Sequence, residues 1–145
     1  MGKYHQGKYK IKNPHKYKGD INNIIYRSSW EAKLLHYLDT KSSVISFSSE
    51  EIIIPYISPL DGRVHRYFPD AWAIMKTNKG LKTYLIEVKP YSQTSLPNPN
   101  RKKTAKLLNE ITTYMVNEAK WDAAEEYCKQ RDWQFLILTE KDIFG

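Results

Sequence analysis

The sequence contains a single cysteine, Cys128, and no apolar run that approaches the roughly 20 residues needed to span a bilayer. A lone cysteine cannot form an intramolecular disulfide, which excludes a disulfide-stapled scaffold and favours a reducing interior. The N-terminus begins polar and lacks the apolar core of a signal peptide, so we expect neither secretion nor a membrane partner. The chain has 145 residues, 41% of them hydrophobic. That length is enough for one domain with a hydrophobic core and too short to suggest two.

Acidic residues are missing between Lys3 and Lys18, and the whole chain carries a formal net charge of +7. The lysines of this segment are Lys3, Lys8, Lys10, Lys12, Lys16 and Lys18, with tyrosines between them at positions 4, 9 and 17. Lysine and tyrosine together can neutralise phosphates and stack on bases, which is typical of nucleic-acid binders. The alternative is a solvated tail whose lysines only aid solubility. We therefore separate a basic, Tyr/Lys-rich arm over residues 1–20 from a single domain over residues 21–145.

Hydrophobic periodicity in the rest of the chain predicts the order α-β-β-β-α-β, and hence an α/β (α+β) fold. The predicted elements are a helix from 28 to about 40, strands over 51–56, 63–75 and 81–89, a helical segment from 101 to about 128, and a strand over 133–138. Turn sequences separate the three middle strands, which indicates a meander. The second helical segment is either one helix or two with a break near Asn117. The last strand is expected to return to the sheet after a helical crossover.

Three charged side chains interrupt these strands. Glu87 and Lys89 close an apolar strand and point to the same side of it, because side chains alternate along a strand. Asp70 lies on the preceding extended stretch, where a short turn can bring it next to Glu87. Neighbouring carboxylates repel each other, and Mg²⁺ held by one or two carboxylates, waters and phosphate oxygens is a common remedy. Lys89 could then act at the attacking water of a phosphodiesterase. The alternatives are a strand-end ion pair of Glu87 with Lys89 and a turn aspartate after Pro69.

The residues Pro69-Asp70 and Glu87-Val88-Lys89 resemble the signature of the PD-(D/E)xK nucleases. The motifs that make the resemblance more specific are "HQGKYK" (5–10), "YRSSWE" (26–31), "RYFPD" (66–70), "EVKPY" (87–91) and "TEKDIF" (139–144). Together they are similar to the TnsA-like branch and, more closely, to the head completion nucleases of T-even-type tailed bacteriophages. The resemblance implies a restriction-endonuclease-like core with a mixed sheet flanked by helices.

The resemblance also implies roles for individual residues. Asp70, Glu87, Lys89 and Glu31 would be catalytic. Asp70, Glu87, Glu31 and the backbone carbonyl of Val88 would hold Mg²⁺, with Mn²⁺ as a substitute. Glu31 has a second interpretation, because Ser28-Ser29-Trp30-Glu31 is also a capping box that would place this glutamate at a helix start.

The implied function is a Mg²⁺-dependent DNA nuclease that acts in phage head completion and processes packaged DNA before head–tail joining. Its partners would be DNA and phage portal or head–neck proteins, without a small-molecule cofactor, in the host cytoplasm during assembly or in the virion. The residues expected to face DNA are the arm lysines, Gln93, Arg101, Lys102 and Lys103, with Lys106 beyond them; a solvated helix start explains the last four equally well. The alternatives are another nuclease of the superfamily, such as a junction resolvase or transposase-type end cutter, and a non-catalytic DNA-binding head-plug protein.

Overall fold

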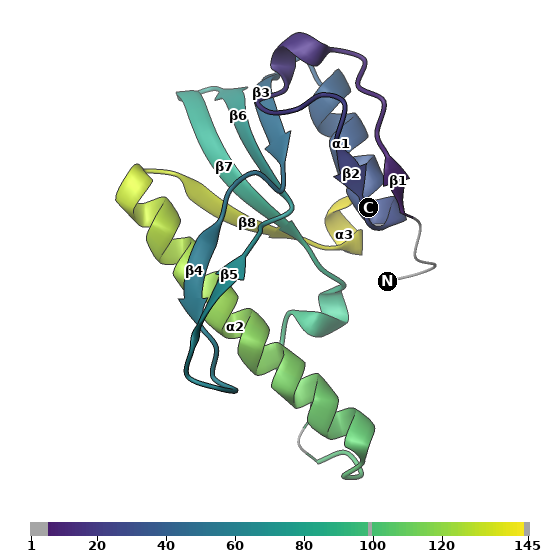
Figure 1. Cartoon of the computed structure of the whole chain (residues 1–145), viewed down its shortest axis with the longest axis vertical. Coiled ribbons are helices and arrows are strands. Elements are labelled where there is room, and N and C mark those ends of the chain that lie inside the picture. The colour runs from purple at the N-terminus through teal and green to yellow at the C-terminus, as the bar shows by residue number, and fades with distance from the viewer. Residues whose placement is uncertain (1–5, 99, 144–145) are drawn as a thin grey trace.

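Four strands of this chain form one mixed sheet in the order β3-β6-β7-β8 (Figure 1). The computed structural model describes residues 6–98 and 100–143. The elements, in chain order, are β1 Gly7–Lys8, η1 Pro14–Lys16, β2 Ile25–Tyr26, α1 Ser29–Thr40, β3 Val44–Ser49, β4 Ile54–Ile57, β5 Val64–Tyr67, β6 Ala71–Thr77, β7 Gly80–Val88, η2 Tyr91–Gln93, α2 Ala105–Arg131, β8 Gln134–Leu138 and α3 Glu140–Ile143. β3, β6 and β7 are antiparallel, and β8 joins β7 in parallel after the α2 crossover. No helix in the described part of the chain is long and apolar enough to cross a membrane.

The two faces of the sheet are covered by different elements, as the alternation of side chains along β7 requires. Ile86 and Val88 pack with Leu34, Leu35 and Leu38 of α1 on one face. Leu85 points to the other face, where it meets α2 and the β4–β5 hairpin. The buried residues of this second cluster are Ile54, Tyr56, Tyr67, Leu85, Trp121, Ala124 and Cys128. The cores on both sides therefore meet at β7, the strand that ends in the Glu-Val-Lys sequence.

Both long helices begin at a side-chain cap. Ser28 Oγ accepts a hydrogen bond from the Glu31 N–H at the start of α1, and Thr104 Oγ1 accepts one from the Leu107 N–H at the start of α2. The predicted end of the first helix near residue 40 is confirmed. The second helical segment is one continuous helix that passes through Asn117 and ends at Arg131, followed by the C-cap residue Asp132 with a left-handed φ of 58°.

The α-β-β-β-α-β order holds for the core, but the first of its strands was assigned to the wrong residues. The core strand is β3, whereas residues 51–56 and 63–67 contribute to a separate β4–β5 hairpin. Glu50 takes a φ of 54° directly after β3, which turns the chain away from the sheet. The sequence did not predict β3, because two of its buried positions are serines, Ser46 and Ser48, and serine does not contribute to an apolar strand pattern. The predicted strand over 63–75 is likewise divided, into β5 and β6.

The N-terminal segment packs onto the domain over residues 6–20, which corrects the expectation of a separate arm. Tyr17 is buried with its ring 5.2 Å from that of Phe47, and the Tyr9 hydroxyl donates to Asp39 Oδ2 at 2.6 Å. Lys16 is also buried, and its Nζ donates to the carbonyl oxygens of Asp39 and Lys41. Lys16 therefore cannot contact DNA, because its ammonium is already bound inside the protein.

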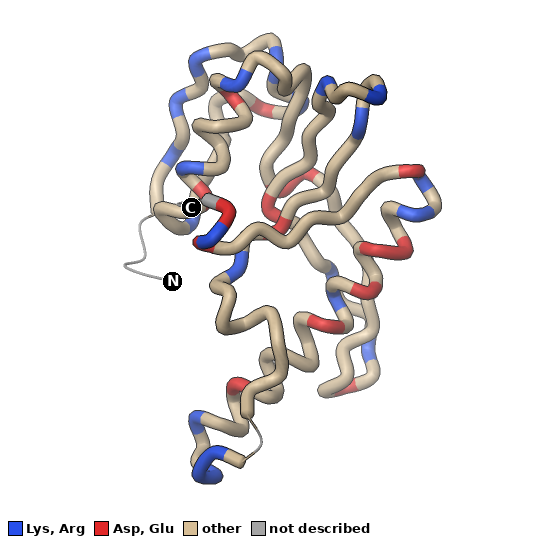
Figure 2. The backbone as a smooth tube through the Cα atoms, turned by 180° about the vertical axis from the view of Figure 1, so that it is seen from behind, with Lys and Arg blue, Asp and Glu red and all other residues tan. Residues whose placement is uncertain are grey.

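The other lysines of this segment are placed differently. Lys8, Lys10, Lys12 and Lys18 are exposed, and Figure 2 shows basic positions along this part of the chain. Lys3 lies outside the described residues.

Asp39 fastens the N-terminal segment to α1. It is fully buried and accepts hydrogen bonds from the Tyr9 hydroxyl and from the backbone N–H groups of Lys12 and Asn13. We expect Asp39→Ala to lower the free energy of unfolding by about 3 kcal/mol, because three donors lose one fully buried acceptor together. Urea unfolding measures this loss. The exposed Asp122→Ala is the control, and equal midpoints for the two variants would contradict the anchoring role.

Candidate active site

The ends of β6 and β7 bring Asp70 and Glu87 together. Ala71 pairs with Ile86, so the residue before Ala71 arrives beside the residue after Ile86. Asp70 itself lies in the break between β5 and β6, where its Oδ2 accepts a hydrogen bond of 2.7 Å from the Val88 N–H. The antiparallel register and this bond fix the first carboxylate against the strand that carries the second.

Glu87 is buried and is held from two sides. The Tyr67 hydroxyl donates to its Oε1 at 2.7 Å, and Lys89 Nζ lies 3.6 Å from its Oε2. Lys89 is partly exposed just beyond β7, and its backbone N–H donates to the Leu138 carbonyl at 2.9 Å. The Glu87 carboxylate and the Lys89 ammonium therefore lie next to each other at the end of β7, as strand alternation predicts.

The electrostatics of this pair favour a bound cation. Burial raises the pKa of Asp70 well above its ordinary value, and the charges of Glu87 and Glu31 raise it further. Burial also raises the pKa of Glu87, although Lys89 and the Tyr67 hydroxyl oppose that shift. Keeping both carboxylates ionised is costly unless positive charge arrives from outside.

Glu31 occupies the first turn of α1 and serves there as a capping residue. Its N–H donates to Ser28 Oγ at 3.2 Å, while its own Oε2 accepts from the Arg27 N–H at 3.0 Å rather than from the N-cap residue. Burial raises the pKa of Glu31, and the charges of Glu50 and Glu87 raise it as well. The residue thus makes cap contacts and also lies within the field of the carboxylate pair.

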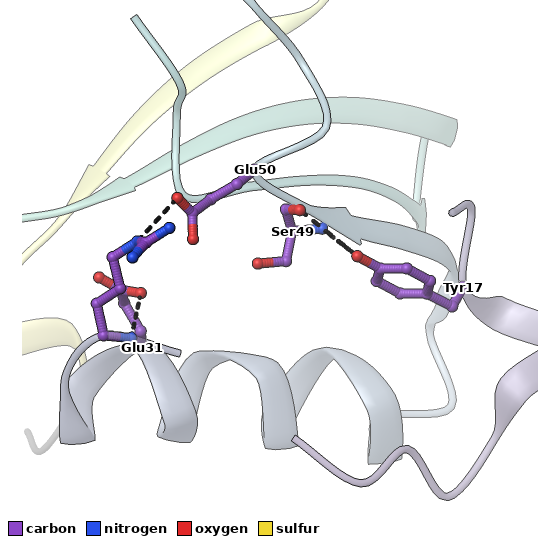
Figure 3. A network of polar contacts seen from close by, with 5 residues as sticks. Tyr17, Glu31, Ser49 and Glu50 are labelled. Carbon is purple, nitrogen blue, oxygen red and sulfur yellow. Dashed lines mark hydrogen bonds and ion pairs between the residues drawn. The ribbon is translucent and has the colours of Figure 1, made fainter. Parts of the chain in front are cut away.

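A further carboxylate, Glu50, was not anticipated from the sequence. Figure 3 shows it at the end of β3, facing Glu31 at the start of α1. Arg27 Nε lies 3.2 Å from Glu50 Oε1, and the Glu50 N–H donates to the Asp70 carbonyl at 3.3 Å. Glu50 therefore supports the loop that carries Asp70. The sequence gives little indication that Glu50 lies near the site, because Glu50 and Glu51 together resemble the polar start of a strand.

A second cation, Lys120, was also missed. It projects from α2 with its Nζ 5.8 Å from the centre of the Tyr56 ring and 5.7 Å from that of Tyr67. Burial lowers the pKa of Lys120, and the charge of Lys89 lowers it further, whereas Glu87 raises it. No motif marks this residue, and α2 carries two other lysines, Lys106 and Lys129, at exposed positions.

The oxygen donors of the site suit Mg²⁺. In residues 6–98 and 100–143, no three Asp, Glu, His or Cys side chains converge into a ready-made metal cluster. Mg²⁺ does not need one, since it is commonly held by one or two carboxylates and completes its shell with water and phosphate oxygens. Asp70 and Glu87 fit that requirement, while Glu31 stays outside such a cluster in this arrangement. Val88 follows Glu87 directly in sequence and donates its N–H to Asp70 Oδ2.

The residues expected to face DNA beyond the strand end are spread along the segment before α2. Gln93 is exposed in η2. Arg101 pairs with Glu110 of α2, while Lys102 and Lys103 are exposed in the loop that precedes that helix. Figure 2 shows the cluster of basic positions at this end of the molecule.

Comparison with known proteins gives a consistent result. The family described as "TnsA-like endonuclease N terminal" matches residues 41–140, a range that contains Asp70, Glu87 and Lys89 but not Glu31. The chain is also 40% identical over 143 residues to the protein named "Head completion nuclease" of Enterobacteria phage T4, covering 96% of this chain and 93% of that relative. The mixed sheet with flanking helices is the restriction-endonuclease-like fold that this match implies. This protein belongs to the family of TnsA-like endonucleases.

Proposed function

We propose that the protein is a Mg²⁺-dependent deoxyribonuclease in which Asp70 and Glu87 hold the metal. The observation that carries this proposal is the pair of neighbouring carboxylates with raised pKa values at the end of β7, beside Lys89. A divalent cation, when bound there, offsets the repulsion of the pair and polarises the scissile phosphate and the attacking water. Mn²⁺ prefers similar oxygen ligands and is expected to substitute. Members of the PD-(D/E)xK superfamily generally use divalent metals, which supports this assignment.

The side chains of the site have separable tasks in this proposal. Lys89 orients the attacking water and stabilises the negative charge that develops on the phosphate. Tyr67 fixes the Glu87 carboxylate through its 2.7 Å hydrogen bond, and the Val88 N–H does the same for Asp70. Pre-set orientation of this kind lowers the reorganisation needed when the substrate arrives. Glu31 and the Val88 carbonyl remain proposed metal ligands, through direct contact or a bound water.

The proposed biological setting is phage head completion, in which the nuclease processes packaged DNA before head–tail joining. Similarity to the T4 protein over nearly the whole of both chains supports this setting. It would place the protein in the host cytoplasm during assembly, or in the virion, with DNA and portal or head–neck proteins as partners. A resolvase or a transposase-type end cutter of the same family is the second candidate, favoured by the match to TnsA-like endonucleases.

A cleavage assay tests the chemistry. Linear and circular DNA, single- and double-stranded, are incubated with the protein in Mg²⁺, in Ca²⁺ and in chelator. We expect cutting in Mg²⁺, and binding with little cutting in Ca²⁺, because its looser coordination positions water and phosphate poorly. Cutting in chelator would refute the metal requirement, and binding without cutting in Mg²⁺ or Mn²⁺ would favour the non-catalytic head-plug alternative.

Lys120 is proposed to contact the phosphate backbone at the cut. We expect Lys120→Gln to reduce cleavage by about 100-fold, the typical cost of removing one stabilising group from such a site. The melting temperature should not fall, because the substitution removes a half-buried charge that no carboxylate neutralises within 4.0 Å among the described residues. Lys120→Arg should restore part of the activity. The control is Lys129→Gln on an exposed turn of α2, and equal activity of both Gln variants would remove Lys120 from the site.

A further inference from the structure

A groove with a volume of ≈ 590 Å³ lies between the segment that follows β7 and the N-terminal half of α2. Gln93 and Pro97 line it from the loop, and Lys106, Tyr114 and Asn117 line it from the helix. The volume is in the range of cavities that hold a small ligand, about 300–1,000 Å³.

One residue that lines the groove, Asn117, is a buried polar side chain. Only 4% of this residue is exposed, and its Nδ2 has no hydrogen-bond partner among the described residues. A buried amide donor without a partner destabilises a fold, so such groups require an explanation. At this position a leucine would pack without that penalty. An acceptor atom supplied by a ligand in the groove would satisfy the amide.

The rest of the lining identifies the class of ligand. Tyr114 offers an aromatic ring that is braced edge-on by Trp121, at 6.4 Å between ring centres. Lys106 is an exposed cation at the groove, and Arg101 adds another whose charge is balanced by Glu110. Basic groups beside a stacking ring are the usual means of binding unpaired nucleic-acid strands.

Both walls of the groove carry residues that lie a few positions along the chain from residues of the candidate active site. Gln93 follows Lys89 by one short turn, η2, which is held by a 2.7 Å hydrogen bond from the Tyr91 N–H to Glu140 Oε1. On the other wall, Asn117 precedes Lys120 by three residues, so the two lie on the same side of α2. The groove therefore lies beside the candidate active site, within reach of a strand that leaves the cut phosphate.

We propose that the groove binds an unpaired DNA strand that adjoins the phosphodiester to be cut. The protein would then prefer duplexes with a single-stranded extension over blunt duplexes. Asn117 donates to a base or sugar-phosphate oxygen, Tyr114 stacks on a base and Lys106 neutralises a phosphate. This inference rests on the proposed nuclease function for its biological meaning, but binding can be measured without cleavage.

The test is fluorescence anisotropy in Ca²⁺ with one labelled duplex, prepared with blunt ends and with a short 3′ or 5′ single-stranded extension. We expect tighter binding of an extended duplex by the unmodified protein. Asn117→Leu should weaken binding of the extended duplex by about fivefold, the loss expected for one hydrogen bond, and leave blunt-duplex binding unchanged. Its melting temperature should stay equal or rise, because the unsatisfied amide is gone.

Lys106→Gln and Lys129→Gln form a matched pair, since both remove one exposed charge from α2. Only Lys106→Gln should flatten the salt dependence of binding to the extended duplex, by about 0.7 in the slope of log affinity against log salt. Equal affinity for blunt and extended duplexes, or an unchanged affinity of Asn117→Leu, would overturn the groove assignment. Failure of Mg²⁺-dependent cleavage with the extension preference intact would instead overturn the proposed nuclease function and support the groove.

Discussion

Asp70→Asn is expected to stabilise the metal-free protein at about pH 8 and to abolish cleavage. Burial and the neighbouring carboxylates raise the pKa of Asp70 in the folded protein. A carboxyl group with a raised folded-state pKa contributes stability that is complete below its ordinary pKa and is lost as the pH rises through the raised value. The asparagine variant lacks this loss, and its carbonyl oxygen can still accept from the Val88 N–H. Its advantage in stability should therefore grow as the pH rises through the raised pKa of Asp70.

Added Mg²⁺ should make the unmodified protein more stable than Asp70→Asn. A ligand that binds only the folded state stabilises it by about 2.7 kcal/mol at a hundredfold excess over its Kd. The unmodified protein should show this gain, and Asp70→Asn should lose most of it together with at least about 100-fold of the cleavage rate. Thermal melting across pH, with and without Mg²⁺, measures both effects, and the exposed Asp122→Asn is the matched control. If Asp70→Asn is less stable at every pH, or if it still cuts, the carboxylate pair is not the metal site.

Glu31→Gln should separate the two interpretations of this helix-start residue. The amide oxygen of glutamine can still accept from the Arg27 N–H, and the Glu31 N–H bond to Ser28 Oγ is unaffected. The stability change should therefore stay within about 1 kcal/mol. Loss of a full negative charge beside Mg²⁺ should reduce cleavage by about 10- to 100-fold, as is typical for ligands and their supporting groups.

Ser28→Ala should have the opposite effects on stability and on cleavage. It removes the buried acceptor of the Glu31 N–H and should lower stability by about 1 kcal/mol while the carboxylate and cleavage remain. A different pattern would assign Glu31 to capping alone: wild-type cleavage by Glu31→Gln, together with loss of stability in Ser28→Ala and Glu31→Ala. The active site would then consist of Asp70, Glu87 and Lys89.

Local patterns predicted the parts of the fold that local physics controls. The S-x-x-E start of α1, the turn with Gly80 at a φ of 100°, and the apolar return strand β8 all follow from nearby residues. β3 did not follow, because its serines are buried by partners from elsewhere; Ser46 Oγ, for example, donates to the Lys16 carbonyl at 3.3 Å. The packing of the N-terminal segment was not predicted for the same reason, since the acceptor of the Tyr9 hydroxyl and the Lys16 ammonium is Asp39, which lies on α1.

The residues of the candidate site also differ in how well short sequence motifs predict their positions. The proximity of Asp70, Glu87 and Lys89 could be predicted, because strand alternation and one tight turn bring them together within a short stretch of chain. Glu50 and Lys120 reach the site through the backbone conformation after β3 and through the packing of α2, neither of which leaves a short motif. Tyr67 was hidden because the β4–β5 hairpin that carries it was assigned to the main sheet.

The parallel pairing of β7 with β8 has a consequence for when the protein becomes active during its own synthesis. The β6–β7 hairpin can form early, because its strands are adjacent in sequence. The strand that ends in Glu87 and Lys89 gains its outer partner only after the 27 residues of α2 have been made. Translation at about 5–20 residues per second makes that interval seconds long, and non-local parallel pairing is slow to form in any case. In a nascent chain, Glu87 and Lys89 therefore both lack their outer strand until β8 has been made, so we expect cutting to begin only after that point.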